Sequence, residues 1–315
     1  MLSLNGRARE AAAALLAGPE AYRVTVTRHE SGATIVDCGI NTPGSYAAGV
    51  VFARVCMAGL AEVTLTDTFI GDLALPAVTV TANRPVEALM ASQYAGWAIS
   101  RGKYFAMGSG PARALSAGEE LFKEIAHKER SDDAVLCLET AKLPPGEVID
   151  YIAGKTGVAA GRVLLLAAPT ASVVGSVQVS ARVVETAVHK MHTLGFPLEC
   201  VIHGHGVAPL APVAKNDLAA IGRTNDCVLY GGRVTLTVDC DDALIEEKIG
   251  QIPSSASKDY GAAFAELFAR YGDFYKIDPL LFSPAVVTLN NLRSGRVWRA
   301  GAPNEAVLRA SLGLA

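Results

Sequence analysis

The sequence predicts an α+β fold with mixed sheets and helices, in two interleaved domains that form a cleft. Segments with the two-residue period of strands alternate irregularly with segments of helical spacing. Hairpin patterns occur near both ends of the chain, at residues 22–38 and 285–299. No low-complexity linker divides the 315 residues, which argues against two domains joined end to end. We expect one domain to combine residues 1–85 with 200–315 and the other to contain residues 86–199.

The N-terminal part begins with a helix and a hairpin. Residues 4–17 have helical spacing, whereas residues 22–28 alternate with period two and residues 33–38 form the returning strand after a turn at Gly32. The elements expected next are a helix at 49–59, strands at 62–66 and 77–81, and a helix at 85–100 that has Trp97 on its apolar side.

Two continuous apolar runs mark the middle of the chain. Residues 134–138 and 163–167 are apolar throughout, which is typical of strands buried on both faces. The middle part is completed by a short helix at 148–156 and a long helix at 172–194 that ends before Gly195. In the C-terminal third we expect strands at 227–230, 233–238, 285–289 and 296–299, and helices at 242–250 and 260–270.

Composition excludes several classes of protein. Half of the residues are hydrophobic and 19% are charged, with a net charge of −3 and no basic cluster, so nucleic acid is not an expected partner. No apolar run approaches the roughly 20 residues of a membrane-spanning helix, and Glu10 interrupts the N-terminal segment that most resembles a signal peptide. We expect a cytoplasmic protein. Its six cysteines form no C-x-x-C pair, which indicates buried free thiols.

The helix expected at 172–194 contains the most informative pattern. At 100° per residue, one narrow stripe holds Arg182, Glu185, His189 and His192, and the rest of the circumference is largely apolar. Two interpretations are open. The stripe is either a solvated edge with an i,i+3 ion pair, the more common case, or a carboxylate held by a guanidinium at the wall of a pocket.

Other motifs are weaker. The glycine loop Gly108-Ser109-Gly110 offers backbone N–H groups that suit an anion, but it matches no nucleotide-binding pattern, and an ordinary turn is equally consistent. His203 and His205 lie on one side of an extended segment, without a third ligand at characteristic spacing, so we expect no metal site. The polar segment 254–261 fits either a helix cap or a ligand loop.

In their order along the chain, these segments resemble the methenyltetrahydromethanopterin cyclohydrolase family over almost the whole length. The segments that carry the resemblance are residues 33–39, 102–105, 108–115, 168–172, 175–178, 180–186, 224–226, 229–233, 256–261 and 273–279. Each is a modest string, but their joint order is specific to the family.

The resemblance implies a homotrimer of two-domain subunits in the one-carbon pathway of methanogens or methylotrophs, with a small-molecule pterin substrate bound between the domains. No metal and no bound cofactor are implied; the tetrahydromethanopterin derivative is the substrate. The motif S-A-R-V-V-E-T makes Arg182 and Glu185 the catalytic pair. The other expected substrate-binding residues are Gly108, Ser109, Gly110, Asn225, Asp226, Lys258 and Asp259.

The chemistry of the reaction fits this pair. The methenyl carbon bridges N5 and N10 of the pterin as an amidinium cation, so attacking water needs only one positioned base, for which Glu185 is the candidate. Burial favours the neutral form of this carboxyl group and Arg182 favours the ionised form. Three alternatives stay open: a cyclohydrolase acting on methenyl-folate, a non-catalytic pterin-binding protein, and a metal-dependent deaminase that uses His203 and His205.

Overall fold

The computed structural model describes residues 3–272 and 276–314, which form two compact units. The first contains Met1–Ala61 and Val86–Gln178, and the second contains Glu62–Pro85 and Val179–Ala315. The units interleave along the chain, as expected, but their bounds differ from the expected ones. Residues 1–61 belong with the middle of the chain, and residues 179–199 belong with its C-terminal third. Strand pairing explains the first difference from the expected division, because the N-terminal hairpin extends the sheet built by the middle of the chain.

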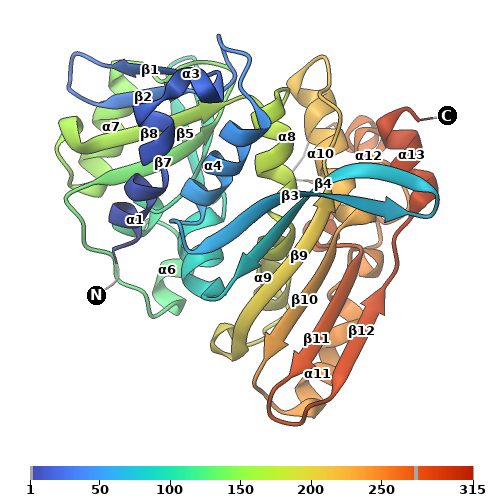
Figure 1. Cartoon of the computed structure of the whole chain (residues 1–315). Coiled ribbons are helices and arrows are strands. Elements are labelled where there is room, and N and C mark those ends of the chain that lie inside the picture. The colour runs from blue at the N-terminus through green and yellow to red at the C-terminus, as the bar shows by residue number, and fades with distance from the viewer. Residues whose placement is uncertain (1–2, 273–275, 315) are drawn as a thin grey trace. The chain divides into compact units, whose positions relative to one another are not determined.

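The first unit is built on a six-stranded mixed sheet in the order β1-β2-β8-β7-β6-β5 (Figure 1). Its strands are β1 (Thr25–Arg28), β2 (Thr34–Asp37), β5 (Trp97–Arg101), β6 (Tyr104–Ser109), β7 (Ala134–Glu139) and β8 (Val163–Ala168). The central strands β2, β8 and β7 are parallel, whereas β1, β6 and β5 join antiparallel to their neighbours. The two apolar runs predicted as buried strands are confirmed as β7 and β8.

Helices cover both faces of this sheet. Alternate residues of β7 belong to different apolar clusters: Leu136 packs in a cluster with residues of α7, and Cys137 packs in another with residues of α1 and α4. This alternation explains why a strand buried on both faces is apolar throughout. The helices of the unit are α1 (Leu4–Ala11), α2 (Ala13–Ala17), α3 (Pro19–Tyr22), α4 (Tyr46–Cys56), a π-helix (Val86–Gln93), α5 (Ala112–Ser116), α6 (Leu121–Glu124) and α7 (Gly146–Thr156).

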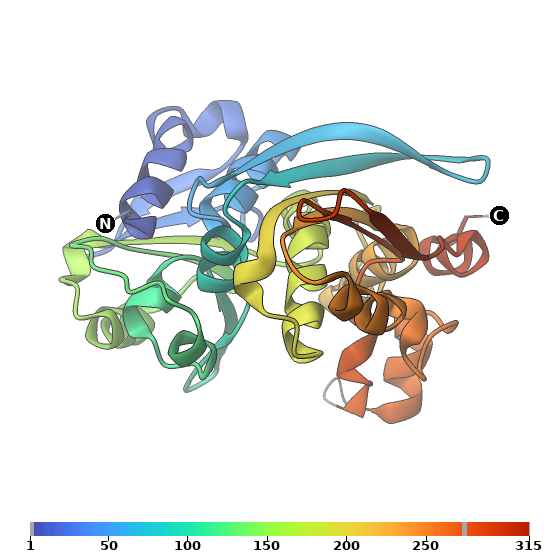
Figure 2. The ribbon, with the colours of Figure 1, turned by 90° about the horizontal axis from the view of Figure 1, so that it is seen from below.

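The second unit has its own six-stranded sheet, in the order β12-β11-β10-β9-β4-β3. Its strands are β3 (Ala61–Ile70), β4 (Leu73–Ala82), β9 (Val201–Pro209), β10 (Arg233–Val238), β11 (Val286–Asn291) and β12 (Val297–Gly301). β10 and β11 run parallel, whereas β12 with β11, β10 with β9 and β9 with β4 pair antiparallel. Figure 2 shows β3 and β4 as a long two-stranded ribbon at one edge of this sheet.

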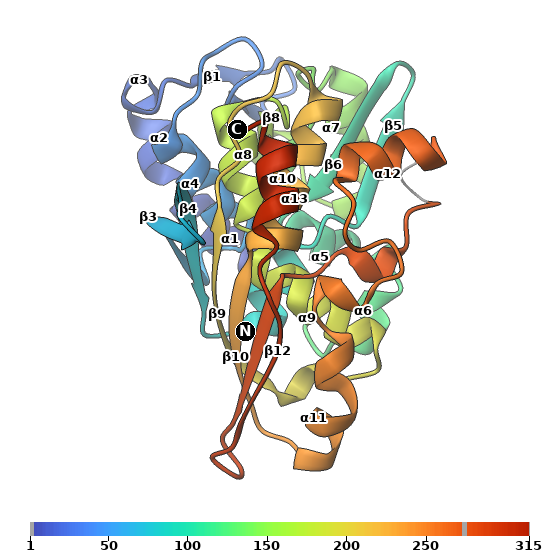
Figure 3. The ribbon, with the colours of Figure 1, turned by 90° about the vertical axis from the view of Figure 1, so that its right-hand side faces the viewer.

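Three helices of the second unit pack around one apolar cluster. Tyr230 of α10, Phe264 of α12 and Leu308 of α13 are all buried in it, and α13 lies beside α10 (Figure 3). The helices are α9 (Val183–Thr193), α10 (Asp217–Gly231), α11 (Asp242–Lys248), α12 (Phe264–Tyr271) and α13 (Glu305–Leu312). A further helix, α8 (Val173–Ser180), crosses the boundary between the two units.

Two predicted elements have the wrong type in whole or in part. Residues 227–230 are not a strand but the last turn of α10, which begins after Asn216, whose side chain accepts a hydrogen bond from the Ala219 amide. Trp97 opens strand β5 rather than lying on a helix, because the preceding helical segment ends at Gln93 as a π-helix. The predicted free thiols are confirmed: five of the six cysteines are buried, and Cys200 is partly exposed.

Candidate functional site

The helix that was expected to run unbroken from Ser172 to Leu194 is in fact two helices. α8 ends at Ser180, and α9 starts at Val183, with Arg182 as its N-cap residue. The fully buried hydroxyl of Ser180 donates to the carbonyl of Pro209, which ties the end of α8 to the end of β9. The expected stripe is therefore interrupted at its first member: Arg182 precedes α9, while Glu185 lies in the first turn.

α9 lies unusually close to β9. A Cβ atom built on Gly204 would lie 2.5 Å from Cγ1 of Val184, and one on Gly206 would lie 2.9 Å from Cγ2 of the same side chain. Only glycine at these two strand positions lets the first turn of the helix approach so closely. His203 and His205 lie together on the other face of β9, which confirms the prediction that they share one side of an extended segment, and both are exposed.

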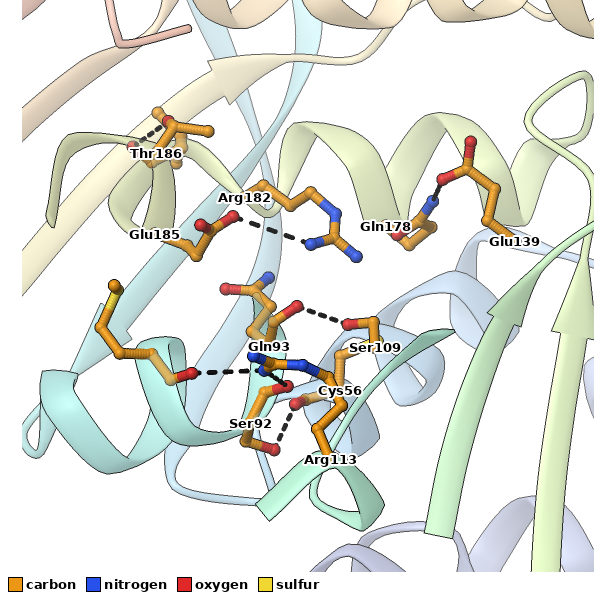
Figure 4. Close-up of polar contacts among 12 residues, drawn as sticks. Cys56, Ser92, Gln93, Ser109, Arg113, Glu139, Gln178, Arg182, Glu185 and Thr186 are labelled. Atoms are coloured by element: carbon orange, nitrogen blue, oxygen red, sulfur yellow. Dashed lines mark hydrogen bonds and ion pairs between the residues drawn. The ribbon is translucent and has the colours of Figure 1, made fainter. Parts of the chain in front are cut away.

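Arg182 and Glu185 form an ion pair that is largely shielded from solvent (Figure 4). The distance from Nη1 of Arg182 to Oε2 of Glu185 is 3.7 Å, and the two side chains are 12% and 5% exposed. A solvated edge is therefore the wrong interpretation of this pattern. At 3.7 Å the groups attract each other without a direct hydrogen bond. The carboxylate lies in the first turn of α9, where the helix dipole favours negative charge.

Sequence reasoning missed the lysine of α9. Lys190 is only 2% exposed and donates to the carbonyl of Leu280. Burial lowers the pKa of its ammonium group to about 8, against the opposing influence of Asp278. Asp278 in turn accepts from the Ser257 hydroxyl at 2.7 Å, so the charge that acts on Lys190 is held by a partly buried bond from the loop after Ser254. A single lysine in a helical sequence gives no signal of burial, since it usually faces water.

The segment expected as a glycine loop begins within β6, where Gly108 and Ser109 are the last two strand residues, and it uses its polar groups within its own unit. The Ser109 hydroxyl donates to the carbonyl of Gln93 at 2.5 Å, and the Gly110 amide donates to the carbonyl of Ser92 at 2.8 Å. Gly110 has φ 113°, a conformation that requires glycine. The Gly110 amide is therefore not available to an anion.

Arg113, which follows this loop, is fully buried. Its guanidinium pairs with Glu119, with one bond of 2.8 Å from Nε. It also donates to the carbonyls of Met90 and Ser92, and Figure 4 shows Arg113 beside Ser92. The loop and Arg113 thus hold the end of the π-helix. Such helices occur mostly as short segments, frequently at functional sites.

Asn225 and Asp226 of α10 both bond to other residues of the protein. The Asn225 amide donates to the carbonyl of Ile221 at 2.8 Å. Asp226 is fully buried and accepts from the Phe264 amide at 3.0 Å and from the Ser311 hydroxyl. Burial raises the pKa of Asp226 to about 7. The two bonds of Asp226 attach the start of α12 and the end of α13 to α10.

Asp259 and Lys258 differ in their surroundings. Asp259 accepts from the Tyr271 hydroxyl at 2.7 Å and from the Asp278 amide at 2.8 Å, whereas the Lys258 side chain is exposed.

Contact of any of the expected binding residues with substrate stays a prediction. Asp273, Phe274 and Tyr275, part of one segment that carries the resemblance, lie outside the described residues.

Metal-ligating side chains do not gather anywhere in residues 3–272 and 276–314: no group of three or more His, Cys, Asp or Glu residues is placed to hold an ion. In the same part of the chain, no helix has the length and apolar character needed to cross a membrane.

The sequence is similar to those of known proteins along nearly its whole length. The sequence profile of the family described as Cyclohydrolase (MCH) matches residues 3–312. A protein of Methanocaldococcus jannaschii is 46% identical over 319 residues, with 99% of each chain covered. One of Methanococcoides burtonii is 42% identical over 100% of this chain and 99% of its own. One of Methylobacillus flagellatus is 45% identical over 95% and 92%, respectively. All three carry the name methenyltetrahydromethanopterin cyclohydrolase.

Proposed function

Because the chain belongs to the cyclohydrolase (MCH) family, we propose that it catalyses the reversible hydrolysis of 5,10-methenyltetrahydromethanopterin to N5-formyltetrahydromethanopterin in one-carbon metabolism. The relatives carry this activity in their names and match the chain over nearly its full length. The structural observation that supports the proposal is the shielded pair of Arg182 and Glu185 at the start of α9.

Glu185 acts as the general base in this proposal. Its carboxylate takes a proton from water while the water oxygen attacks the methenyl carbon, and the amidinium cation becomes a neutral tetrahedral adduct. The carboxylic acid then returns the proton to N10, the C–N10 bond breaks, and the hydroxyl proton leaves as the formyl carbonyl forms. The net products are the N5-formyl compound and one proton. Because the carboxylate carries the proton in both steps, one base suffices.

Arg182 keeps Glu185 ionised and holds it in position. A carboxylate that is 5% exposed would lose much of its hydration, and the guanidinium 3.7 Å away supplies the compensating charge. The separation leaves both groups able to bond to a third partner, such as a water molecule, rather than only to each other. The rigid contact of Val184 with Gly204 fixes the first turn from which Glu185 extends.

The assembly and location are also proposals. We infer a homotrimer in the cytoplasm from the family resemblance, and the low charge content of 19% is consistent with surface buried between subunits. The cleft expected between the two units stays a prediction. Light scattering that gave a mass near that of one 32.8 kDa chain at micromolar concentration would contradict the trimer.

Loss of the methenyl absorbance on mixing with purified protein tests the reaction. We expect catalytic decay of this absorbance above the rate in buffer alone, which must be subtracted because the substrate also hydrolyses unaided in base. Binding without turnover would instead favour a pterin carrier. Faster turnover of methenyl-tetrahydrofolate than of the methanopterin substrate would favour the folate alternative.

A further inference from the structure

Glu139 ends strand β7 at an edge of the sheet where ligands commonly bind. The parallel strands β2, β8 and β7 all finish there, and in open sheets of this kind the carboxyl ends of parallel strands adjoin the binding crevice. Glu139 lies opposite Ala168 of β8 and is half-buried. Strand alternation places its side chain on the same face as Cys137, the face that α4 covers.

The Glu139 carboxylate is oriented by two neutral donors. Oε1 accepts from the Thr170 hydroxyl at 2.5 Å. Oε2 accepts from the side-chain amide of Gln178 at 2.8 Å, as Figure 4 shows. Within the described residues, no lysine, arginine or histidine forms an ion pair with it. Each carboxylate oxygen has two acceptor sites, so one site on each oxygen remains after these bonds. The group is therefore a fixed, partly exposed carboxylate with capacity for two more donors.

We propose that Glu139 is a specificity-determining residue that binds the 2-amino-4-oxopyrimidine edge of the pterin. That edge presents two neighbouring, nearly parallel donors, the N3–H group and the exocyclic amine. Paired donors of this kind match the two oxygens of a carboxylate, the geometry that makes bidentate contacts both strong and selective. The inference rests on the proposed function, since it assigns one end of the same substrate.

Chain connectivity is consistent with this assignment. Gln178, which holds Glu139, precedes Arg182 by only four residues, and four residues extend over at most about 14 Å. One short segment thus carries Gln178, which holds the group proposed for the pyrimidine ring, and Arg182, which pairs with the proposed base. Thr170 and Gln178 orient the carboxylate and are positioning residues.

Fragment binding to the wild-type protein tests the proposal without any substitution. The probes are 6-methyltetrahydropterin and its 2-deamino analogue, which lacks the exocyclic amine. We expect the intact fragment to bind at least about tenfold more tightly, because a hydrogen bond to a charged group is lost with the analogue. Equal affinity for the two fragments would overturn the proposal. This readout does not depend on turnover, so it separates failure of this inference from failure of the proposed reaction.

Glu139→Gln provides the second test, with Asp150→Asn on the exposed face of α7 as the matched control. In E139Q we expect KM for the methenyl substrate to rise by about tenfold or more and kcat to stay within about threefold, since the contact forms equally in the ground and transition states. E139Q should also discriminate less than about threefold between the two fragments, whereas D150N should match the wild type. An unchanged KM, or a fall in kcat alone, would contradict the assignment.

Discussion

Gly204→Ala tests whether the packing of α9 on β9 positions the proposed base. The added Cβ atom would lie 2.5 Å from Cγ1 of Val184, whereas carbon atoms in contact prefer about 3.5–4.0 Å. Relief of this overlap requires the first turn of α9 to move by about 1 Å. Overpacking of this kind costs about 1–3 kcal/mol of stability. Because a 1 Å displacement of a catalytic group can cost about a hundredfold in rate, we expect kcat to fall by about tenfold to a hundredfold.

The assay combines decay of the methenyl absorbance with urea unfolding. In the double variant Gly204→Ala/Val184→Ala, the Val184 methyl groups that would overlap are absent, so kcat should recover most of its loss even though stability stays reduced. Gly154→Ala is the matched control, since a Cβ atom on this glycine of α7 would have no neighbour within 4 Å. G154A should keep full activity and gain about 0.5–1 kcal/mol. Wild-type kcat and stability in G204A would refute the reasoning.

Three further predictions concern charge, burial and metal. In Arg182→Ala, the acid limb of the pH–rate profile should move to higher pH, with activity partly recovered at pH 8–9; a loss that is uniform across pH would mean that Arg182 positions substrate or water instead. Burial raises the pKa of Asp226 from 3.8 to about 7, so the folded state binds this proton more tightly and stability should fall by up to about 4 kcal/mol as pH rises from about 4 to 7. In Asp226→Asn, the free energy of unfolding measured with urea should depend less on pH than in the wild type. The same pH dependence in both proteins would contradict the assignment to Asp226. Exhaustive chelation should leave turnover intact, because the amidinium carbon is already electrophilic; activity lost with chelator and restored by zinc would contradict this.

The elements that could be predicted from the sequence are those whose residue pattern fits only one type of secondary structure. β7 and β8 are apolar throughout and lie between two helical layers, so their burial follows directly from their composition. Residues 227–230 are equally apolar, yet they end a helix, since a short apolar run fits a buried helix turn as well as a strand. The capping Asn216 was the available signal for that helix.

The candidate site was only partly predictable for a related reason. The spacing of Arg182 and Glu185 indicated that they meet, but it did not show that their side chains are only 12% and 5% exposed, because burial is set by neighbours that need not be close in sequence. Similarly, no local pattern distinguishes Asp226, which makes buried contacts with residues far along the chain, from a ligand-binding carboxylate. Long-range packing determined both outcomes.

The central claim is that Glu185 is the base, and the turnover of Glu185→Gln tests it most directly. The amide keeps the shape of the side chain, which is 5% exposed beside Arg182, but it cannot take a proton from water. We expect kcat to fall by at least about a hundredfold, the lower range for a positioned general base, with the thermal midpoint and the affinity for a tetrahydropterin fragment essentially unchanged. Turnover near the wild-type value in a folded E185Q protein would contradict the account.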